Sequence, residues 1–205
     1  MTIDLWAARL ERPLEEQEME TLERLLPAER RARLERMRNQ ALRREPLCAY
    51  AMLRWALRER YGWWTLPEIR TAEGGKPGFA DHPEVHFSIS HTAGAVLVGL
   101  ADRPVGADIE KLRPVSPRVM SRMAGTTTEQ AFFRLWVRRE ARTKRDGSGI
   151  GAMLRTEPPM KEGEHYRELV LFPGYRAGIS VCCDEPPAWN IRSVTLDELL
   201  AANMA

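Results

Sequence analysis

Three carboxylates occupy positions from which they could bind a metal ion. Asp108 and Glu110 belong to the segment VGADIE, and Glu140 follows about 30 residues later in LWVRREARTK. Residues two apart in an extended strand point to the same face, so Asp108 and Glu110 should lie side by side. Their like charges repel, and a divalent cation such as Mg²⁺, which prefers oxygen ligands, would remove that repulsion. A solvated strand end would contain the same pair, so neighbouring residues must decide between the two interpretations.

The surroundings of Glu140 favour a functional position. Trp136, Glu140 and Lys144 are spaced by four in EQAFFRLWVRREARTK and therefore share one stripe of a predicted helix. Trp136 should face the core, which carries Glu140 toward buried or cleft surface. The alternative is a simple Glu–Lys pair on a solvated helix face, worth a few tenths of a kcal/mol.

Two further segments contain groups that suit a phosphate ligand. FSISHTAG places Ser90 and His91 at the end of a predicted strand, where a histidine can contact a phosphate, act as a base, or serve only as a hydrogen-bonded structural residue. GGKPG adds Lys76 in a loop whose glycines allow a ligand to approach the backbone closely. Ser90 lacks the G-x-S-x-G context, which argues against a serine hydrolase.

The elements around these residues predict a mixed fold. Leucines and alanines at helical spacing between about residues 15 and 61 predict two or three helices, broken near Pro27 and Pro46. A loop rich in Gly and Pro follows at residues 71–84. VHFSIS and AVLVGLA, separated by HTAG, then predict a β-hairpin, and VGADIE begins a further strand.

The second half repeats this order loosely. It contains a predicted helix at residues 129–145, a loop DGSGIG, and two strands, YRELVLF and AGISVCC, around the turn PGYR. This pattern predicts an α+β fold in which two similar α+β lobes form a pseudo-dimer. We place the N-terminal lobe at residues 1–104 and the C-terminal lobe at residues 105–205, with the active site in a cleft at their interface.

Composition is that of a soluble globular protein. The 205 residues suffice for a sizeable core, with 43% hydrophobic and 29% charged residues. No apolar run approaches the roughly 18 residues that a membrane span requires, so we expect a cytoplasmic protein that does not bind membranes. The three cysteines, Cys48, Cys182 and Cys183, lack metal-ligand spacing and are typical of a reducing compartment.

The net charge of +2 is unevenly distributed, because the segment ERRARLERMRNQALRR contains seven arginines and two glutamates. Such a stripe could bind phosphate groups or an acidic protein, or it could be the solvated face of a helix. A nucleic-acid-binding function is a weaker alternative, because the sequence has no recognised motif for it and lacks a strongly basic balance. We therefore expect no nucleic-acid partner.

The order of these motifs carries a family resemblance. Read from the N-terminus, GKP, FSISHT, VGADIE and FFRLWVRREARTKRDG resemble the surfactin-synthetase-activating type of 4′-phosphopantetheinyl transferase between about Gly75 and Gly147, and more faintly to the end of the chain. The resemblance implies that the protein transfers the phosphopantetheine arm of coenzyme A to a serine of an acyl or peptidyl carrier protein. The implied products are the holo-carrier protein and adenosine 3′,5′-bisphosphate.

The resemblance also implies roles for the motif residues. Asp108, Glu110 and Glu140 correspond to the ligands of Mg²⁺, with Mn²⁺ as an alternative ion. Glu140 would take the proton from the carrier serine, directly or through a metal-bound water. Lys144 and His91 would act as catalytic residues that contact the pyrophosphate.

Four further positions correspond to the coenzyme A site. Lys76 and Pro77 match the loop along the nucleotide, Ser90 matches a position lining the same pocket, and Arg44 is the arginine expected to reach the nucleotide. Three features depart from the family pattern: Arg139 stands where a Lys is usual, Arg44 aligns only with a one-residue shift, and about 18 residues separate Glu110 from the next helix. The connection between Glu110 and the next helix is short, which leaves the choice of carrier protein open.

Two other interpretations remain within the family. The first is a non-catalytic relative that binds coenzyme A or carrier proteins without turnover, which the retained carboxylates and lysine disfavour. The second is the small trimeric holo-acyl-carrier-protein synthase type, which is about half this length. Two lobes in one chain instead favour a monomer with a single active site.

Overall fold

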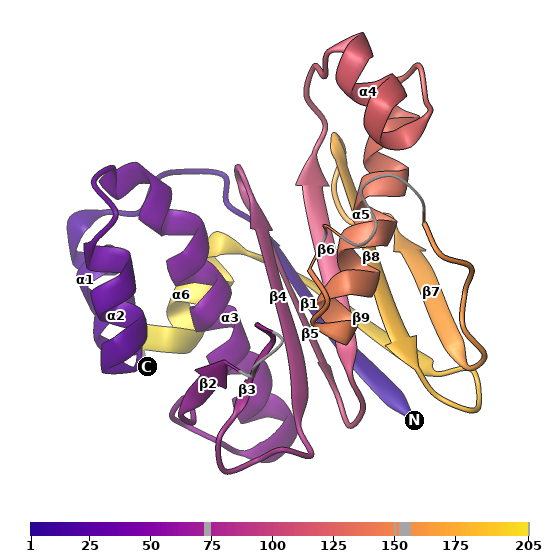
Figure 1. Ribbon diagram of the computed structural model, residues 1–205. Helices are drawn as coiled ribbons and strands as arrows, with labels where there is room; N and C mark the ends of the chain where they lie inside the picture. Colours follow the sequence, from indigo (N-terminus) through magenta and orange to yellow (C-terminus); the bar gives the residue numbers. More distant parts are fainter. Residues whose placement is uncertain (72–74, 150, 152–156, 205) are drawn as a thin grey trace.

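The computed structural model describes residues 1–71, 75–149, 151 and 157–204, which form an α+β fold with three sheets (Figure 1). The prediction of a mixed α+β architecture is thus confirmed. Parts of the two predicted loops, residues 72–74 and residue 150, lie outside the described residues. Among the described helices, none combines the length and apolar character that crossing a bilayer requires.

The first sheet has four strands in the order β4-β5-β1-β9. These strands are β1 (Thr2–Arg9), β4 (His86–Thr92), β5 (Ala95–Ala101) and β9 (Ala188–Thr195). β4 and β5 form the predicted antiparallel hairpin, whereas β9 returns from the far end of the chain to pair in parallel with β1. The beginning and the end of the chain therefore share one sheet.

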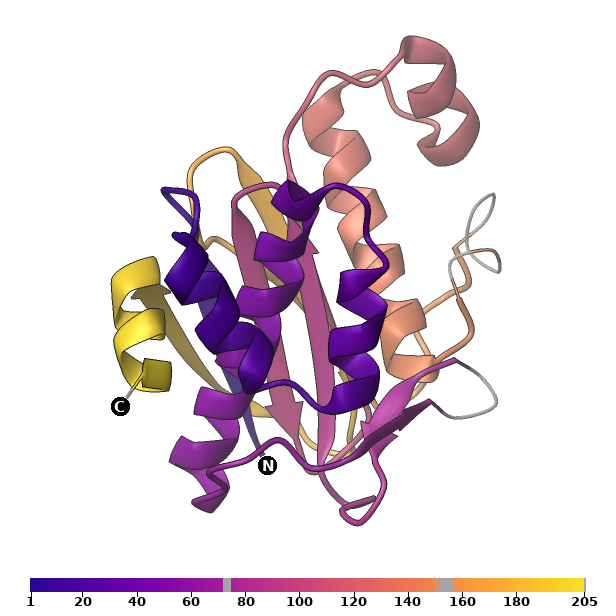
Figure 2. The ribbon, with the colours of Figure 1, turned by 90° about the vertical axis from the view of Figure 1, so that its left-hand side faces the viewer.

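Helices cover one face of this sheet, and Figure 2 looks onto them. They are α1 (Glu16–Arg24), α2 (Ala28–Glu35), the 3-10 helix η1 (Gln40–Arg43), α3 (Arg44–Tyr61) and the C-terminal α6 (Leu196–Met204). Pro27 precedes the first residue of α2, as the predicted break requires. Pro46 instead lies in the first turn of α3, where a missing N–H costs nothing, so the second break falls before it.

The second sheet has three strands in the order β6-β8-β7. They are β6 (Val105–Lys111), β7 (Glu164–Leu169) and β8 (Tyr175–Cys182), and two short strands, β2 (Ile69–Thr71) and β3 (Pro77–Phe79), form a separate ribbon. Both strands predicted around PGYR are present, although β7 ends before Val170, which is 93% exposed. α4 (Pro117–Ala124) and α5 (Glu129–Asp146) connect β6 to β7.

The two larger sheets share one apolar layer. Its buried side chains are Ile3, Leu5, Ala7, Ala95, Leu97 and Ala101 of the first sheet and Val105, Ala107, Ile109, Leu169, Ala177, Ile179 and Val181 of the second. Ile109 points into this layer, so Asp108 and Glu110, one residue away on either side, point to the opposite face of β6. α5 packs on that opposite face.

A glycine allows α5 to lie directly on β6. A Cβ atom added to Gly106 would be 2.0 Å from the carbonyl oxygen of Ala141 and 2.3 Å from the backbone nitrogen of Arg145. No side chain fits there, so the helix backbone touches the strand backbone. This contact brings the residues of α5 within reach of the carboxylates of β6.

Candidate active site

A cavity of about 820 Å³ lies where α2, α3, β4 and α5 meet. Its lining includes five of the residues predicted from the sequence, namely Lys76, Pro77, His91, Glu140 and Lys144. They come from segments about 65 residues apart in the chain, so the fold has collected them. A space of this size holds a nucleotide-sized ligand.

α5 presents Glu140 and Lys144 to this cavity. The helix begins after Thr128, whose hydroxyl accepts a hydrogen bond from the N–H of Ala131, and it ends at Gly147 in the left-handed conformation. Residues four apart lie on one stripe, so both side chains face the same space. Trp136, one turn earlier, is half-buried against a small apolar cluster between α4 and α5 rather than in the main core.

Asp108 is buried beside Lys144. Its Oδ1 accepts hydrogen bonds from the Lys144 ammonium at 2.7 Å and from the Ser90 hydroxyl at 2.7 Å. Its Oδ2 is buried and has no hydrogen-bond partner among the described residues. A carboxylate oxygen left in this state is costly unless a further positive group approaches it.

Glu110 and Glu140 differ in their surroundings. Glu110 accepts hydrogen bonds from Arg113 at 2.9 Å and from the Thr92 hydroxyl at 3.3 Å. Burial raises the pKa of Glu140, and the charges of Asp108 and Glu110 raise it further, against the opposing effect of Lys144. A cation would relieve this mutual repulsion.

The three carboxylates therefore suit a hard divalent cation in their chemistry. The unpaired Asp108 Oδ2 and the raised pKa of Glu140 are the observations that fit such an ion. In the part of the chain that the structure describes, no three His, Cys, Asp or Glu side chains stand close enough to hold a metal ion already. The ligand set Asp108, Glu110 and Glu140 thus remains a prediction.

A lysine and a histidine also line the cavity. The Lys76 ammonium donates hydrogen bonds to the carbonyl oxygens of Val105 at 3.0 Å and Arg145 at 2.7 Å, and burial lowers its pKa to about 8. His91 keeps solvent access, yet the surrounding protein and then the charge of Lys144 lower its pKa. Near neutral pH, His91 is accordingly a neutral group that can donate or accept a hydrogen bond.

The arginine-rich segment contributes Arg30 and Arg33 to the cavity lining, whereas Arg44 was the residue expected there. Arg44 does not line the cavity: it donates to Glu45 at 2.6 Å and to the carbonyl oxygen of Arg12 at 3.1 Å. Arg30 and Arg33 of α2 line it instead. Arg30 is only 7% exposed, and its Nε and Nη2 have no hydrogen-bond partner among the described residues. Helical spacing of three could have indicated this pair, but it could not decide which arginines face inward.

Two other predicted residues lie behind the cavity wall. Ser90 is buried, and its hydroxyl is occupied by Asp108, Lys144 and the N–H of Ile109. Arg139, which stands where the family pattern has Lys, is buried on another side of α5 and donates to the carbonyl oxygen of Met123. Arg139 thus ties α5 to the end of α4.

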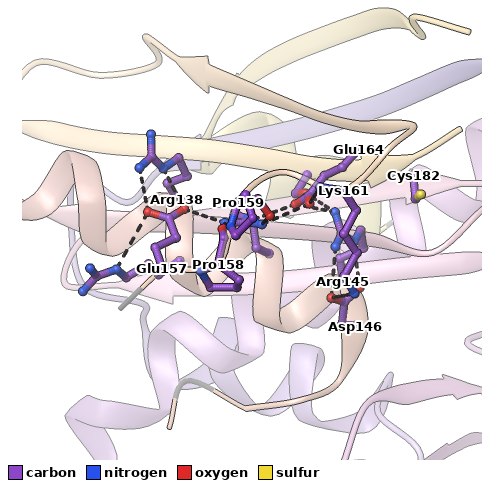
Figure 3. Close-up of polar contacts among 12 residues, drawn as sticks. Arg138, Arg145, Asp146, Glu157, Pro158, Pro159, Lys161, Glu164 and Cys182 are labelled. Atoms are coloured by element: carbon purple, nitrogen blue, oxygen red, sulfur yellow. Dashed lines mark hydrogen bonds and ion pairs between the residues drawn. The ribbon is translucent and has the colours of Figure 1, made fainter. Parts of the chain in front are cut away.

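A buried charge network holds α5 from the side of β7 (Figure 3). Glu164, whose side chain is fully buried, accepts from Arg142 Nε at 2.6 Å and from the Lys161 N–H at 2.9 Å, and pairs with Arg145 Nη1 at 2.7 Å. Burial alone would raise the pKa of Glu164, but these donors outweigh it and lower the pKa to about 2. Arg142 also binds Glu157, which draws the segment after the undescribed residues onto the helix.

Sequence comparison identifies relatives along the chain, although no protein-family model matches it. The 4′-phosphopantetheinyl transferase Sfp of Bacillus subtilis (strain 168) is 27% identical over 225 residues, covering 96% of this chain and 99% of the relative. The 4′-phosphopantetheinyl transferase psf-1 of Bacillus pumilus is 31% identical and covers 65% of this chain and 63% of its own length. The 4′-phosphopantetheinyl transferase AcpT of Escherichia coli (strain K12) is 34% identical over 97 residues, covering 40% of this chain and 50% of the relative.

These matches agree with the order of the motifs and with the cavity that gathers them. The alignment with Sfp spans nearly the whole of both chains, so the similarity is not confined to one motif. Over most of its length the chain is therefore similar to 4′-phosphopantetheinyl transferases of the surfactin-synthetase-activating type.

Proposed function

We propose that this protein transfers the 4′-phosphopantetheine arm of coenzyme A to a serine of an apo acyl or peptidyl carrier protein. The products are the holo-carrier protein and adenosine 3′,5′-bisphosphate. The observation that carries the proposal is the cavity, which brings one carboxylate of raised pKa, Glu140, together with Lys76, Lys144, His91 and Arg30 in a chain similar to known phosphopantetheinyl transferases. An anionic ligand with several phosphates suits such a lining.

Asp108, Glu110 and Glu140 are the residues that we propose to hold Mg²⁺, or Mn²⁺ in its place. When bound, the cation neutralises charge on the pyrophosphate and orients the phosphorus for in-line attack. The unpaired Asp108 Oδ2 supports this assignment, because a buried carboxylate oxygen without a donor favours a positive ligand.

Glu140 is the proposed general base. Its carboxylate accepts the proton of the carrier serine while the serine oxygen forms a bond to phosphorus, and the bond from that phosphorus to the oxygen of adenosine 3′,5′-bisphosphate breaks. Adenosine 3′,5′-bisphosphate is the leaving group, and the electron pair of the broken bond stays on its phosphate oxygen. Glu140 lines the cavity in which the coenzyme is proposed to bind, and its ionised carboxylate can accept that proton.

The cationic side chains hold the coenzyme. Lys144 and His91 are proposed to donate to the pyrophosphate, and Lys76 and Pro77 to border the nucleotide. Arg30 lines the cavity and has two buried nitrogens without a hydrogen-bond partner among the described residues, and it is proposed to bind a nucleotide phosphate in place of the expected Arg44. Fixed donors of this kind act most strongly where charge develops in the transition state.

We propose that the two larger sheets and their helices are the two lobes of a pseudo-dimer with the active site between them. The predicted division into residues 1–104 and 105–205 needs one correction: β9 and α6 come from the second range but belong to the first sheet and its core. Lining residues from both halves of the chain support that proposal. One chain then suffices for one site, so we propose a cytoplasmic monomer.

Intact-mass spectrometry tests the function. The protein is incubated with coenzyme A, Mg²⁺ and a panel of apo carrier proteins from fatty acid, polyketide and nonribosomal peptide pathways, with and without EDTA. A mass gain of roughly 340 Da, the size of the phosphopantetheine arm, that EDTA abolishes is the expected result for a metal-dependent transferase. Binding of coenzyme A without any gain on the panel would instead indicate the non-catalytic relative.

A further inference from the structure

Three alternate hydroxyl side chains of β4 lie along the boundary with β6. Ser88, Ser90 and Thr92 are two residues apart, so they point to the same face of the first sheet. β6 is an edge strand of the second sheet, and among the described residues no strand pairs with its outer N–H groups. We call the contact between these hydroxyls and β6 the hydroxyl seam.

The hydroxyl seam replaces a backbone ladder. The three hydroxyl oxygens accept hydrogen bonds from alternate N–H groups of β6 at 2.9, 3.2 and 3.4 Å. The pairs are Ala107 with Ser88, Ile109 with Ser90, and Lys111 with Thr92. The hydroxyl side chains of β4 thus accept hydrogen bonds from backbone N–H groups of β6 that would otherwise lack a partner in a neighbouring strand.

Two of the three hydroxyls also contact carboxylates. Ser90 donates to Asp108 Oδ1 at 2.7 Å and accepts from the Lys144 ammonium at 2.9 Å. Thr92 contacts Glu110 Oε2 at 3.3 Å. Ser88 instead has only the backbone of Ala107 as its partner in the hydroxyl seam.

The hydrogen-bond capacity of Ser90 is used up by these contacts. A hydroxyl has one proton and two acceptor lone pairs, and Ser90 gives its proton to Asp108 and accepts from Lys144 and Ile109. It has no proton left for a phosphate. Its contribution must therefore pass through Asp108 and Lys144.

We propose that Ser90 and Thr92 are positioning residues, which fix the carboxylates of Asp108 and Glu110 for the metal ion, while Ser88 only joins the two sheets. The inference rests on the proposed function for its metal, but it concerns the side chains of this chain. Each hydroxyl holds its carboxylate and the backbone of the same strand at once, which limits how far that carboxylate can turn. Loss of the hydroxyl should weaken metal binding more than it weakens the fold.

The test measures Mn²⁺ binding directly, by electron paramagnetic resonance of free Mn²⁺, on the full chain without coenzyme A or carrier protein. Thr92→Val and Ser90→Ala remove a hydroxyl that contacts a carboxylate, and Thr92→Ser retains one. Ser88→Ala is the matched control, since it removes a hydroxyl of the hydroxyl seam that contacts no carboxylate. Thermal unfolding of each variant reports the structural cost separately.

We expect Thr92→Val and Ser90→Ala to weaken Mn²⁺ binding by about 3- to 10-fold, as the loss of one hydrogen bond to a charged group does. Thr92→Ser should bind within about twofold of the unsubstituted protein, and Ser88→Ala should lower the melting temperature without changing the affinity. Equal weakening by Ser88→Ala, or unchanged affinity in both Thr92→Val and Ser90→Ala, would overturn the inference.

Transfer activity is assayed in parallel and separates the two proposals. A protein that binds Mn²⁺ in the expected pattern but modifies no carrier protein would contradict the proposed function alone. A protein that transfers phosphopantetheine but shows no difference between Thr92→Val and Ser88→Ala in Mn²⁺ binding would contradict the inference alone.

Discussion

Glu140, the proposed general base, lies where burial and nearby carboxylates disfavour its ionised form. Its pKa is raised by burial and by the neighbouring carboxylates, so the folded state holds its proton more tightly than the unfolded state does. Ionisation of this group therefore costs folding stability as the pH rises above the unfolded value. Such a cost is typical of residues retained for function rather than for stability.

We predict that Glu140→Gln lowers the rate of transfer by at least about 100-fold, because the amide cannot accept the serine proton. The free energy of unfolding at pH 7 should stay constant or rise by up to about 1 kcal/mol, since the unfavourable charge is gone. Single-turnover kinetics and urea unfolding measure the two effects. The exposed Glu16→Gln is the control, and an active but destabilised Glu140→Gln would refute the assignment.

Arg30 lines the cavity and has two buried nitrogens without a hydrogen-bond partner among the described residues, and this predicts a binding role. Arg30→Met keeps most of the apolar stem and should raise the KM for coenzyme A about 10-fold or more with a smaller change in kcat, because a charge-assisted hydrogen bond is lost. Arg36→Met, an exposed residue that follows α2, is the control. Comparison with 3′-dephospho-coenzyme A tells which phosphate Arg30 contacts, and equal KM values for Arg30→Met and the control would exclude the role.

At the scale of elements, the position of α5 on β6 decides whether the site forms. Gly106 permits backbone contact between the two elements, and the network around Glu164 holds the helix from the side of β7. Gly106 lets the backbone of α5 contact the backbone of β6, and the ion pairs of Glu164 keep α5 in that position.

Gly106→Ala should be strongly destabilising, by about 3 kcal/mol or more, because a Cβ 2.0 Å from the Ala141 oxygen forces the helix off the strand. Transfer activity should fall with it, since Glu140 and Lys144 move with α5. Gly78→Ala is the matched control, as a Cβ there meets nothing within 4 Å and its backbone angle is ordinary. Urea unfolding and transfer assays on both variants check the prediction, which fails if the two substitutions behave alike.

Glu164 makes folding stability depend on acid pH. Its pKa is about 2 in the folded protein against 4.5 for the ordinary carboxyl, so its contribution is complete above pH 4.5 and is lost as the pH falls toward 2. The size is on the order of 3 kcal/mol. The unfolding free energy measured in urea at pH 7, 5, 4 and 3 should fall accordingly.

Glu164→Gln should remove part of that acid dependence and cost about 3–5 kcal/mol at pH 7, because Arg142 and Arg145 would remain buried without their shared carboxylate. Glu168→Gln serves as the control, since that carboxylate is partly exposed and pairs with exposed Arg134. A Glu164→Gln variant with unchanged stability and an unchanged acid profile would contradict the proposed importance of the network.

At the scale of the whole molecule, the C-terminal elements β9 and α6 pack with the N-terminal half of the chain. β9 pairs with β1, and Leu199 and Leu200 of α6 are buried in the same apolar core as α3. The two main sheets also share an apolar layer. Unfolding of one half should therefore expose the core of the other.

We predict a single cooperative transition in differential scanning calorimetry, with equal calorimetric and van't Hoff enthalpies, despite the two proposed lobes. Deletion of residues 196–205 should abolish that transition, because it removes α6 from the main core. Two resolved transitions in the full chain would show that the two proposed lobes unfold independently.

Local patterns in the sequence predicted much of the architecture. The hairpin of β4 and β5, the strand β6 and the helix α5 all follow from residue spacing, since a strand or helix period is set by the backbone itself. β1 and the parallel pairing of β9 could not be predicted in the same way. Their partners are about 186 residues apart, and no local pattern records such a pairing.

For the site, the sequence by itself determined the resemblance to the phosphopantetheinyl transferases, through the order of GKP, SHT, DIE and the α5 motif, and it indicated the carboxylates and lysines. Only the tertiary structure decided which residues face the cavity: it placed Arg30 there instead of Arg44, and it placed Ser90 behind Lys144. The physical reason is that helical or strand spacing fixes which side chains share a face. Which face becomes buried, and what each charged or hydroxyl group then contacts, depends on packing between segments far apart in the chain.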